Sequence, residues 1–238
     1  MARQFLTSIC DILRITGHKK YLYPRKHQQL SKRVVRDLKF WRRFITPSSK
    51  MGFKYILGVL PANNIKLASD ACTSYGMAGV LTFDQHIGHK SGVDGLFWQI
   101  NWVEWANFAT MAELAPGSVK INIAEFIAAL ITCETYAEYC AGKITTLEID
   151  NITAKAWLDN ARCTRAPYDR CAQGSHMHRL GMNIKIKTSW IPSAQNLIAD
   201  ICSRVPFKVK NKGQSHIVAG QRYRRISPKF NNLLIYFK

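Results

Sequence analysis

The segment Leu147–Leu158 constrains the fold most, because an apolar, β-branched run ends at an acid and a helical pattern follows at once. The run predicts a buried strand over 143–150, and the residues after it predict a helix over 153–161. Asp150 therefore stands where a strand ends and a helix begins. A carboxylate in that position is rigidly held and still open to solvent, which a metal-dependent active site requires.

Strand and helix patterns continue on both sides of this segment. Residues 84–95 are expected to form a loop, and residues 102–116 show no clear pattern. Further strands are predicted at 64–70, 77–83, 95–102 and 184–191, and further helices at 121–139, 169–180 and 197–204. This order predicts an α/β fold with a mixed five-stranded sheet flanked by helices.

Basic residues gather at the two ends of the chain. Residues 1–50 hold thirteen Lys and Arg against two acids, and residues 201–238 hold nine against none, within a net charge of +19. The middle of the chain is close to neutral. The composition therefore predicts a basic helical segment over 1–50, a core domain over 62–205 and a basic tail over 206–238.

Basic arms around a neutral core favour a polyanionic partner, most often nucleic acid, because cations that neutralise phosphates release counterions. The alternatives are solvated tails, or a surface buried against RNA in a larger ribonucleoprotein assembly. The cations expected to contact nucleic acid are Arg33, Arg36, Arg42, Arg43, Lys208, Lys210, Arg224 and Arg225.

Seven cysteines without a CxxC spacing indicate a reducing compartment rather than a disulfide scaffold. An intracellular location, cytoplasmic or nuclear, is therefore expected, with mitochondrial import of the basic segment 1–20 as the alternative. No apolar run is long enough to span a membrane. Zinc is a separate alternative at Cys163, Cys171, His176 and His178, although their spacing matches no common zinc finger.

Four acids lie at the ends or in the first turns of predicted elements, namely Asp70, Glu125, Asp150 and Asp200. Hard divalent cations take oxygen ligands, and two such ions can clamp the attacking and leaving oxygens of a phosphodiester. Four converging carboxylates would therefore hold two Mg²⁺ ions, with Mn²⁺ as the alternative metal. The competing interpretation is that each acid is an ordinary surface charge.

Glu125 has two interpretations. Asn122 can cap the helix that follows it, and Glu125 comes three residues later, which is the spacing of a capping box. Alternatively, the helix is so apolar that we expect it to pack on the sheet, where Glu125 would face a metal site. The sequence does not separate these two roles.

Several stretches carry a family resemblance: Ser69–Ala71, Ile121–Glu125, Asp150–Ala154 and Trp190–Arg204. In this order they resemble the ribonuclease H domain of retroelement reverse transcriptases, and most of all that of DIRS-type retrotransposons. Upstream, Leu13–Gly17 and Leu30–Phe44 resemble the segment that joins polymerase to ribonuclease H. The resemblance covers about residues 5–205 and leaves out the tail.

The resemblance implies a metal-dependent endonuclease, derived from a retrotransposon polyprotein, that hydrolyses the RNA strand of RNA–DNA hybrids. It implies that Asp70 and Asp150 bind both metal ions, that Glu125 binds the metal near the attacking water, and that Asp200 binds the other. Asn151 is a candidate for contacting the 2′-hydroxyl that distinguishes RNA from DNA. Polymerase domains are the expected protein partners.

Departures from the family pattern keep other functions open. Many cellular ribonucleases H carry a His in the loop before the last acid, where this chain has Pro192–Asn196. The missing polymerase palm and fingers favour a domesticated, non-catalytic RNA-binding or assembly protein that keeps the fold, although the intact acids disfavour it. A DNA nuclease or integrase-like transposase of the same fold is a third interpretation, which the motif details disfavour.

Overall fold

The structure is a computed structural model that describes residues 60–111, 120–164, 166–208 and 214–229. The chain divides into two units at residue 58, and all the described residues belong to the second. The predicted helices of 1–50 therefore lie outside the described residues. The same holds for five of the predicted nucleic-acid contacts, Arg33, Arg36, Arg42, Arg43 and Lys210.

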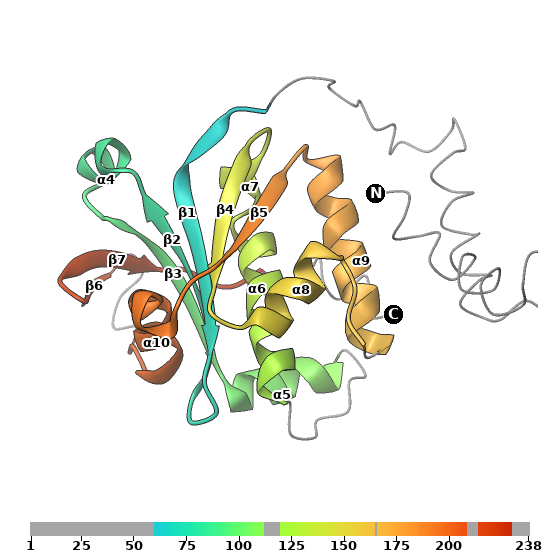
Figure 1. The fold of residues 1–238 in the computed structure, drawn as a ribbon. Coiled ribbons are helices and arrows are strands. Elements are labelled where there is room, and N and C mark those ends of the chain that lie inside the picture. The colour runs from blue at the N-terminus through green and yellow to red at the C-terminus, as the bar shows by residue number, and fades with distance from the viewer. Residues whose placement is uncertain (1–59, 112–119, 165, 209–213, 230–238) are drawn as a thin grey trace, which may run out of the picture. The chain divides into compact units, whose positions relative to one another are not determined.

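The described residues form an α/β fold around one mixed, seven-stranded sheet (Figure 1). The strand order is β5-β4-β1-β2-β3-β7-β6. The strands are β1 (Ala62–Ala71), β2 (Gly76–Phe83), β3 (Gly95–Asn101), β4 (Ile144–Ile149), β5 (Lys185–Trp190), β6 (Ser215–Val218) and β7 (Gln221–Arg225). The first three strands are an antiparallel meander, β4 and β5 run parallel to β1, and β7 runs parallel to β3.

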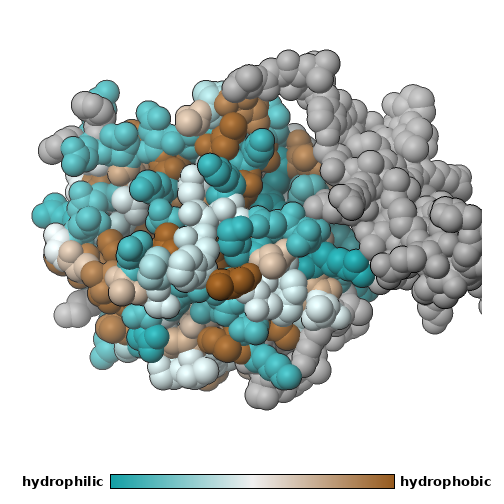
Figure 2. All heavy atoms as spheres, viewed as in Figure 1, coloured by the Kyte–Doolittle hydropathy of each residue, from teal (hydrophilic) through white to brown (hydrophobic). Residues whose placement is uncertain are grey.

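Helices cover both faces of the sheet, with α6, α8 and α9 on one side and α10 on the other (Figure 1). The helices are α4 (Gln85–Ser91), α5 (Trp102–Met111), α6 (Ile121–Thr135), α7 (Ala137–Cys140), α8 (Ile152–Asp159), α9 (Ala166–Gly181) and α10 (Leu197–Arg204). A short 3₁₀ turn, η1 (Ser193–Gln195), precedes α10. On the surface, hydrophobic residues are scattered in small groups over the face shown in Figure 2.

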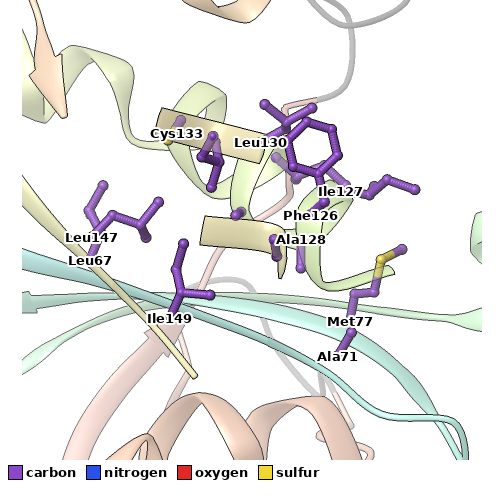
Figure 3. Packing of buried hydrophobic residues seen from close by; sticks show 14 of the residues in the cluster. Leu67, Ala71, Met77, Phe126, Ile127, Ala128, Leu130, Cys133, Leu147 and Ile149 are labelled. Carbon is purple, nitrogen blue, oxygen red and sulfur yellow. The ribbon is translucent and has the colours of Figure 1, made fainter. Parts of the chain in front are cut away.

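Helix α6 is the centre of the larger core, because every residue from Ile123 to Thr135 is buried. Figure 3 shows its apolar side chains facing the sheet, where Leu67, Leu147 and Ile149 point toward it. A helix that is apolar all round must be enclosed, and here sheet, α8 and α9 enclose it. The high apolar content of this segment therefore determines its central position.

A smaller core lies under α10, where Ala199 and Cys202 pack on Val80 and Phe97. The buried side chain of Gln99 fixes the end of this helix. Its amide nitrogen donates to the carbonyl oxygens at 202 and 205, and its amide oxygen accepts from the main-chain N–H at 207. Strand β3 thus sets the position of α10 along the sheet.

The sheet corrects three sequence predictions. It has seven strands rather than five, because the residues predicted as a basic tail supply β6 and β7. The predicted loop 84–95 contains the helix α4. The predicted helix 121–139 is broken at Tyr136, whose buried hydroxyl lies 3.1 Å from the carbonyl oxygens of both Gly79 and Leu96.

Gly79 provides a test of how tightly α6 packs on β2. A Cβ atom at this position would lie 2.0 Å from the Thr132 hydroxyl oxygen and 2.3 Å from the Trp98 indole nitrogen. We expect Gly79→Ala to lower the free energy of unfolding by about 3 kcal/mol, because a buried site cannot accept an extra methyl group without displacing its neighbours. Urea denaturation measures this, with Gly181→Ala as the control.

Gly181 ends α9, and a Cβ atom there would meet nothing within 4 Å. The control should therefore leave the free energy of unfolding within about 1 kcal/mol of that of the unaltered protein. Equal effects of the two substitutions would contradict the close packing of α6 on β2.

Candidate metal centre

Asp70 and Asp150 lie side by side because they end neighbouring parallel strands. Asp70 is the penultimate residue of β1, and Asp150 directly follows β4. Ala68 and Glu148 are partners in the parallel register, so the two aspartates, each two residues further on, lie on the same face of the sheet. The predicted convergence of the first and third acids is thereby explained by strand pairing alone.

Glu125 completes a triad with these aspartates. One carboxylate oxygen of each of Asp70, Glu125 and Asp150 lies within 4.8 Å of the other two. Glu125 is 4% exposed, and its Oε2 atom is buried without a hydrogen-bond partner. A buried carboxylate oxygen without a donor is costly unless a cation or a proton satisfies it. The triad could therefore hold a metal ion.

The capping interpretation of Glu125 is wrong. Helix α6 begins at Ile121, and its N-cap residue, Lys120, makes no side-chain cap. Asn122 lies within the helix and accepts a hydrogen bond of 3.0 Å from the Asn151 side chain. The apolar character of α6, rather than a capping box, decides the position of Glu125 on the sheet.

Asn151 has a structural role at this site. Its side-chain oxygen caps α8 by accepting from the Ala154 N–H at 3.0 Å. Its side-chain nitrogen donates to Asn122, so the residue links the start of α8 to the first turn of α6. These two bonds hold the loop that carries Asp150. Contact between Asn151 and a 2′-hydroxyl stays a prediction.

Burial is the main cause of the raised pKa values of Asp70 and Glu125. It raises the pKa of Asp70 to about 7 and the pKa of Glu125 to about 9. Repulsion from Asp150 and Asp200 adds to the raised pKa of Asp70, and repulsion from Asp70 and Asp150 adds to that of Glu125. Glu125, and in part Asp70, therefore retain protons at neutral pH unless a cation replaces them.

The Ser203 hydroxyl donates to an oxygen of the Asp70 carboxylate and also lies 2.9 Å from the carbonyl oxygen of Asp200. The bond to the carboxylate lowers the pKa of Asp70, against the effect of burial. Ser203 and Asp200 lie three residues apart on α10, so one helix brings both groups to the end of β1. Ser203 therefore favours the charged form of Asp70, which is the form that binds a cation.

Removing this hydroxyl should shift metal binding to higher pH. In Ser203→Ala, the pKa of Asp70 rises further, because its carboxylate loses a donor. We expect the pH midpoint of Mn²⁺ binding to move up by about half to one unit. Calorimetric titrations at several pH values measure this shift. Ser193→Ala, on the exposed η1 turn, is the control, and an unmoved midpoint in Ser203→Ala would refute the role of the hydroxyl.

Asp200 does not join the triad, although it lies close enough to raise the pKa of both Asp70 and Glu125. Its carboxylate accepts a hydrogen bond of 2.6 Å from Arg204, one helical turn later on α10. This is an exposed i,i+4 ion pair, which contributes only about 0.3–0.5 kcal/mol. Asp200 therefore stands next to the triad, held by a weak contact. Its binding to a second ion stays a prediction.

Three neighbours of the acids were not predicted as site residues. Ser203 and Arg204 follow Asp200 at the i+3 and i+4 spacing, which places all three on one side of a helix. The Trp190 indole nitrogen donates to the main-chain oxygen of Asp150 at 2.9 Å. The helical spacing could have identified the first two, but nothing in the sequence indicates the bond from Trp190.

The described residues predicted to contact nucleic acid differ in their surroundings. Lys208 and Arg224 are exposed. Arg225 is half-buried, and its guanidinium donates to the carbonyl oxygens of Phe207 and Gln99. Arg225 therefore ties β7 to the segment after α10, and a contact with nucleic acid stays a prediction for all three.

The zinc alternative finds no support in the part of the chain that the structure describes. The only group of potential metal ligands found there is the acidic triad. Cys163 and Cys171 are buried in the larger core. His178 instead contacts the buried Glu134, whose carboxylate lies 2.6 Å from its ring nitrogen. The contact between Glu134 and His178 joins α6 to α9.

Helices between residues 60 and 229, outside the gaps given above, are all too short or too polar to cross a membrane. Comparisons of this chain with protein-family models, with curated proteins and with solved structures find no match. The acidic triad is therefore the feature on which a function must be argued.

Proposed function

We propose that this chain is a Mg²⁺-dependent nuclease that hydrolyses the RNA strand of RNA–DNA hybrids. The observation that carries the proposal is the triad of Asp70, Glu125 and Asp150, with a buried Glu125 oxygen that lacks a hydrogen-bond donor. An all-oxygen ligand set suits hard divalent ions such as Mg²⁺ or Mn²⁺. The resemblance of the motifs to retroelement ribonucleases H supports the choice of substrate.

The residues of the site would have the following roles. Asp70, Glu125 and Asp150 would hold the ion at the end of β1 and β4. Asp200 would turn from Arg204 toward a second ion, a change that costs little because the pair is exposed. Bound Mg²⁺ would supply charge to stabilise the phosphate and to lower the pKa of the attacking water. Ser203 would keep Asp70 charged, and Trp190 would hold the main chain at Asp150.

The arrangement of the fold also supports a site built on rigid elements. Two acids lie at strand ends, one lies on the buried helix α6, and one lies on a helix fixed by Gln99. The main chain of each acid thus belongs to or directly follows packed secondary structure, as a metal-dependent site requires. A ribonuclease H-like fold, with β6 and β7 as additional strands, is part of the proposal.

The test is cleavage of a hybrid duplex whose RNA and DNA strands carry different labels. Single-stranded RNA, duplex RNA and duplex DNA are run alongside, each with Mg²⁺ and with a chelator. The proposal expects cleavage of the RNA strand in the hybrid alone, dependent on the metal and lost in Asp150→Asn. Cleavage that survives in Asp150→Asn would rule out this site.

Other results would point to the rival functions. Cleavage of duplex DNA would indicate a DNA nuclease or transposase. Binding of RNA without cleavage of any substrate would indicate a non-catalytic RNA-binding or assembly protein. The pairing of Asp200 with Arg204 would then be the resting arrangement of a site that no longer performs chemistry.

A further inference from the structure

Strands β1, β4 and β5 carry a row of lysines on one face. Lys66 pairs in register with Thr146, and Thr146 pairs with Lys187, so the three residues lie in one line across three parallel strands. Partners in a parallel register point to the same side of the sheet. Lys185, two residues before Lys187, points to that side as well. We refer to Lys66, Lys185 and Lys187 as the lysine row.

The lysine row lies on the same face as the two aspartates of the triad. Along β1, Asp70 is four residues from Lys66, and an even separation keeps both side chains on one side. Four residues span about 13 Å at the usual rise of a strand. The row therefore begins a short distance from the triad, on the surface that leads away from it.

This face is the one that α8 leaves uncovered. Thr188 of β5 donates to Asp159 of α8, so the odd-numbered neighbours of Thr188 point to the opposite side of the sheet. On that side α10 packs mainly against β1, β2 and β3. All three lysines are exposed, and neither Lys185 nor Lys187 pairs with an acid of the described residues.

One acid interrupts the positive charge. Glu148 lies between the lysine row and Asp150, in register with Ala68 and Ser189. Its carboxylate is 3.9 Å from the amino group of the exposed Lys66, and Glu148 itself is partly exposed. Apart from the two aspartates of the triad, β1, β4 and β5 thus carry three positive charges and one negative charge on this face.

We infer that the lysine row binds phosphates of the substrate strand, so that the nucleic acid runs from the triad across β1, β4 and β5. This rests on the proposed function, since it is the triad that places the scissile phosphate. Charge complementarity favours a phosphate backbone as the occupant, because lysines on an uncovered face hold phosphates without reading sequence. The distance of about 13 Å places the contacts a few nucleotides from the cut.

The experiment measures hybrid binding by fluorescence anisotropy in a chelator, over a series of salt concentrations, so that cleavage plays no part. In Lys185→Gln/Lys187→Gln, we expect about tenfold weaker binding and a salt dependence whose slope is smaller by about 1 to 2. Glu148→Gln should act in the opposite sense and tighten binding. The control removes the same charge elsewhere, in Lys90→Gln/Lys155→Gln, on α4 and α8.

Each outcome decides the inference. A control that weakens binding as much as the row variant would show that only total charge matters, and would overturn it. The inference would also be overturned if hybrid binding were unchanged in the Lys185→Gln/Lys187→Gln and Glu148→Gln variants. Lysine-dependent binding by a protein that cleaves no substrate would sustain the lysine row as a phosphate-binding surface and refute the nuclease.

Lysine acetylation followed by mass spectrometry tests directly whether the bound hybrid covers the lysine row. We expect Lys185 and Lys187 to be acetylated in the free protein and to be protected when the hybrid is bound. Protection in the free protein would mean that another part of this chain, or a second copy, covers the face. That result would overturn the inference.

Discussion

Replacing Asp70 with asparagine is expected to reduce hybrid cleavage by about 10³-fold or more and to abolish tight Mn²⁺ binding. This carboxylate accepts a hydrogen bond from the Ser203 hydroxyl, and it lies close enough to Asp150 and Asp200 to be repelled by both. An amide cannot supply the negative charge on which the bound ion depends, and that charge is worth several kcal/mol in the transition state. Cleavage rates and calorimetric titration measure the two effects.

Asp159→Asn is the matched control for this substitution. Asp159 is an exposed acid on α8, paired with Lys155 at 2.6 Å, and it lies outside the triad. It should leave both metal affinity and cleavage within about twofold, because an exposed pair contributes little. Normal metal binding by Asp70→Asn would remove the triad from consideration as a metal centre.

Replacing Glu125 with glutamine should stabilise the metal-free protein while abolishing the stabilisation that a metal provides. The folded protein raises the pKa of Glu125 from 4.5 to about 9, chiefly through burial. Between these values the folded state binds more protons than the unfolded state, so stability falls as pH rises. Asp70, with a pKa raised from 3.8 to about 7, adds to this fall at the lower end of the range.

The Glu125→Gln effect should therefore grow with pH. It is expected to be small near pH 4.5, where the acid is protonated in the folded protein and still half protonated in the unfolded protein, and on the order of 2 kcal/mol at pH 7. Denaturant unfolding at a series of pH values in a chelator measures it. In the unaltered protein, added Mn²⁺ should reverse the loss, because the ion replaces the protons. A variant with the pH dependence of the unaltered protein would contradict the raised pKa.

The sequence alone predicts much of the site because its acids depend on local patterns. The alternation of β1 and β4 places Asp70 and Asp150 at strand ends, and the apolar run after Ile121 requires a buried helix. Helix α10 occupies the predicted residues 197–204. These elements are specified by periodicity over a few residues, which a sequence displays directly.

Contacts between distant residues could not be predicted in the same way. Strand β7 is basic throughout much of its length, and its composition resembles a solvated tail. It joins the sheet because Tyr223 is buried in the smaller core and hydrogen-bonds with Thr82, 141 residues away. Asp200 pairs with Arg204 in the structure. Sequence spacing alone does not show whether its partner is Arg204 or a metal ion.

The pairing of β7 with β3 also determines where the folded domain ends. Without residues 215–225, the main-chain groups of β3 that face β7 would form an open edge. Such an edge is a template for pairing with another chain, and natural proteins cover it to avoid aggregation. The same truncation would remove Arg225 from the carbonyl oxygens of Gln99 and Phe207. A fragment ending at Val205 would thus retain all four acids and still be prone to self-association.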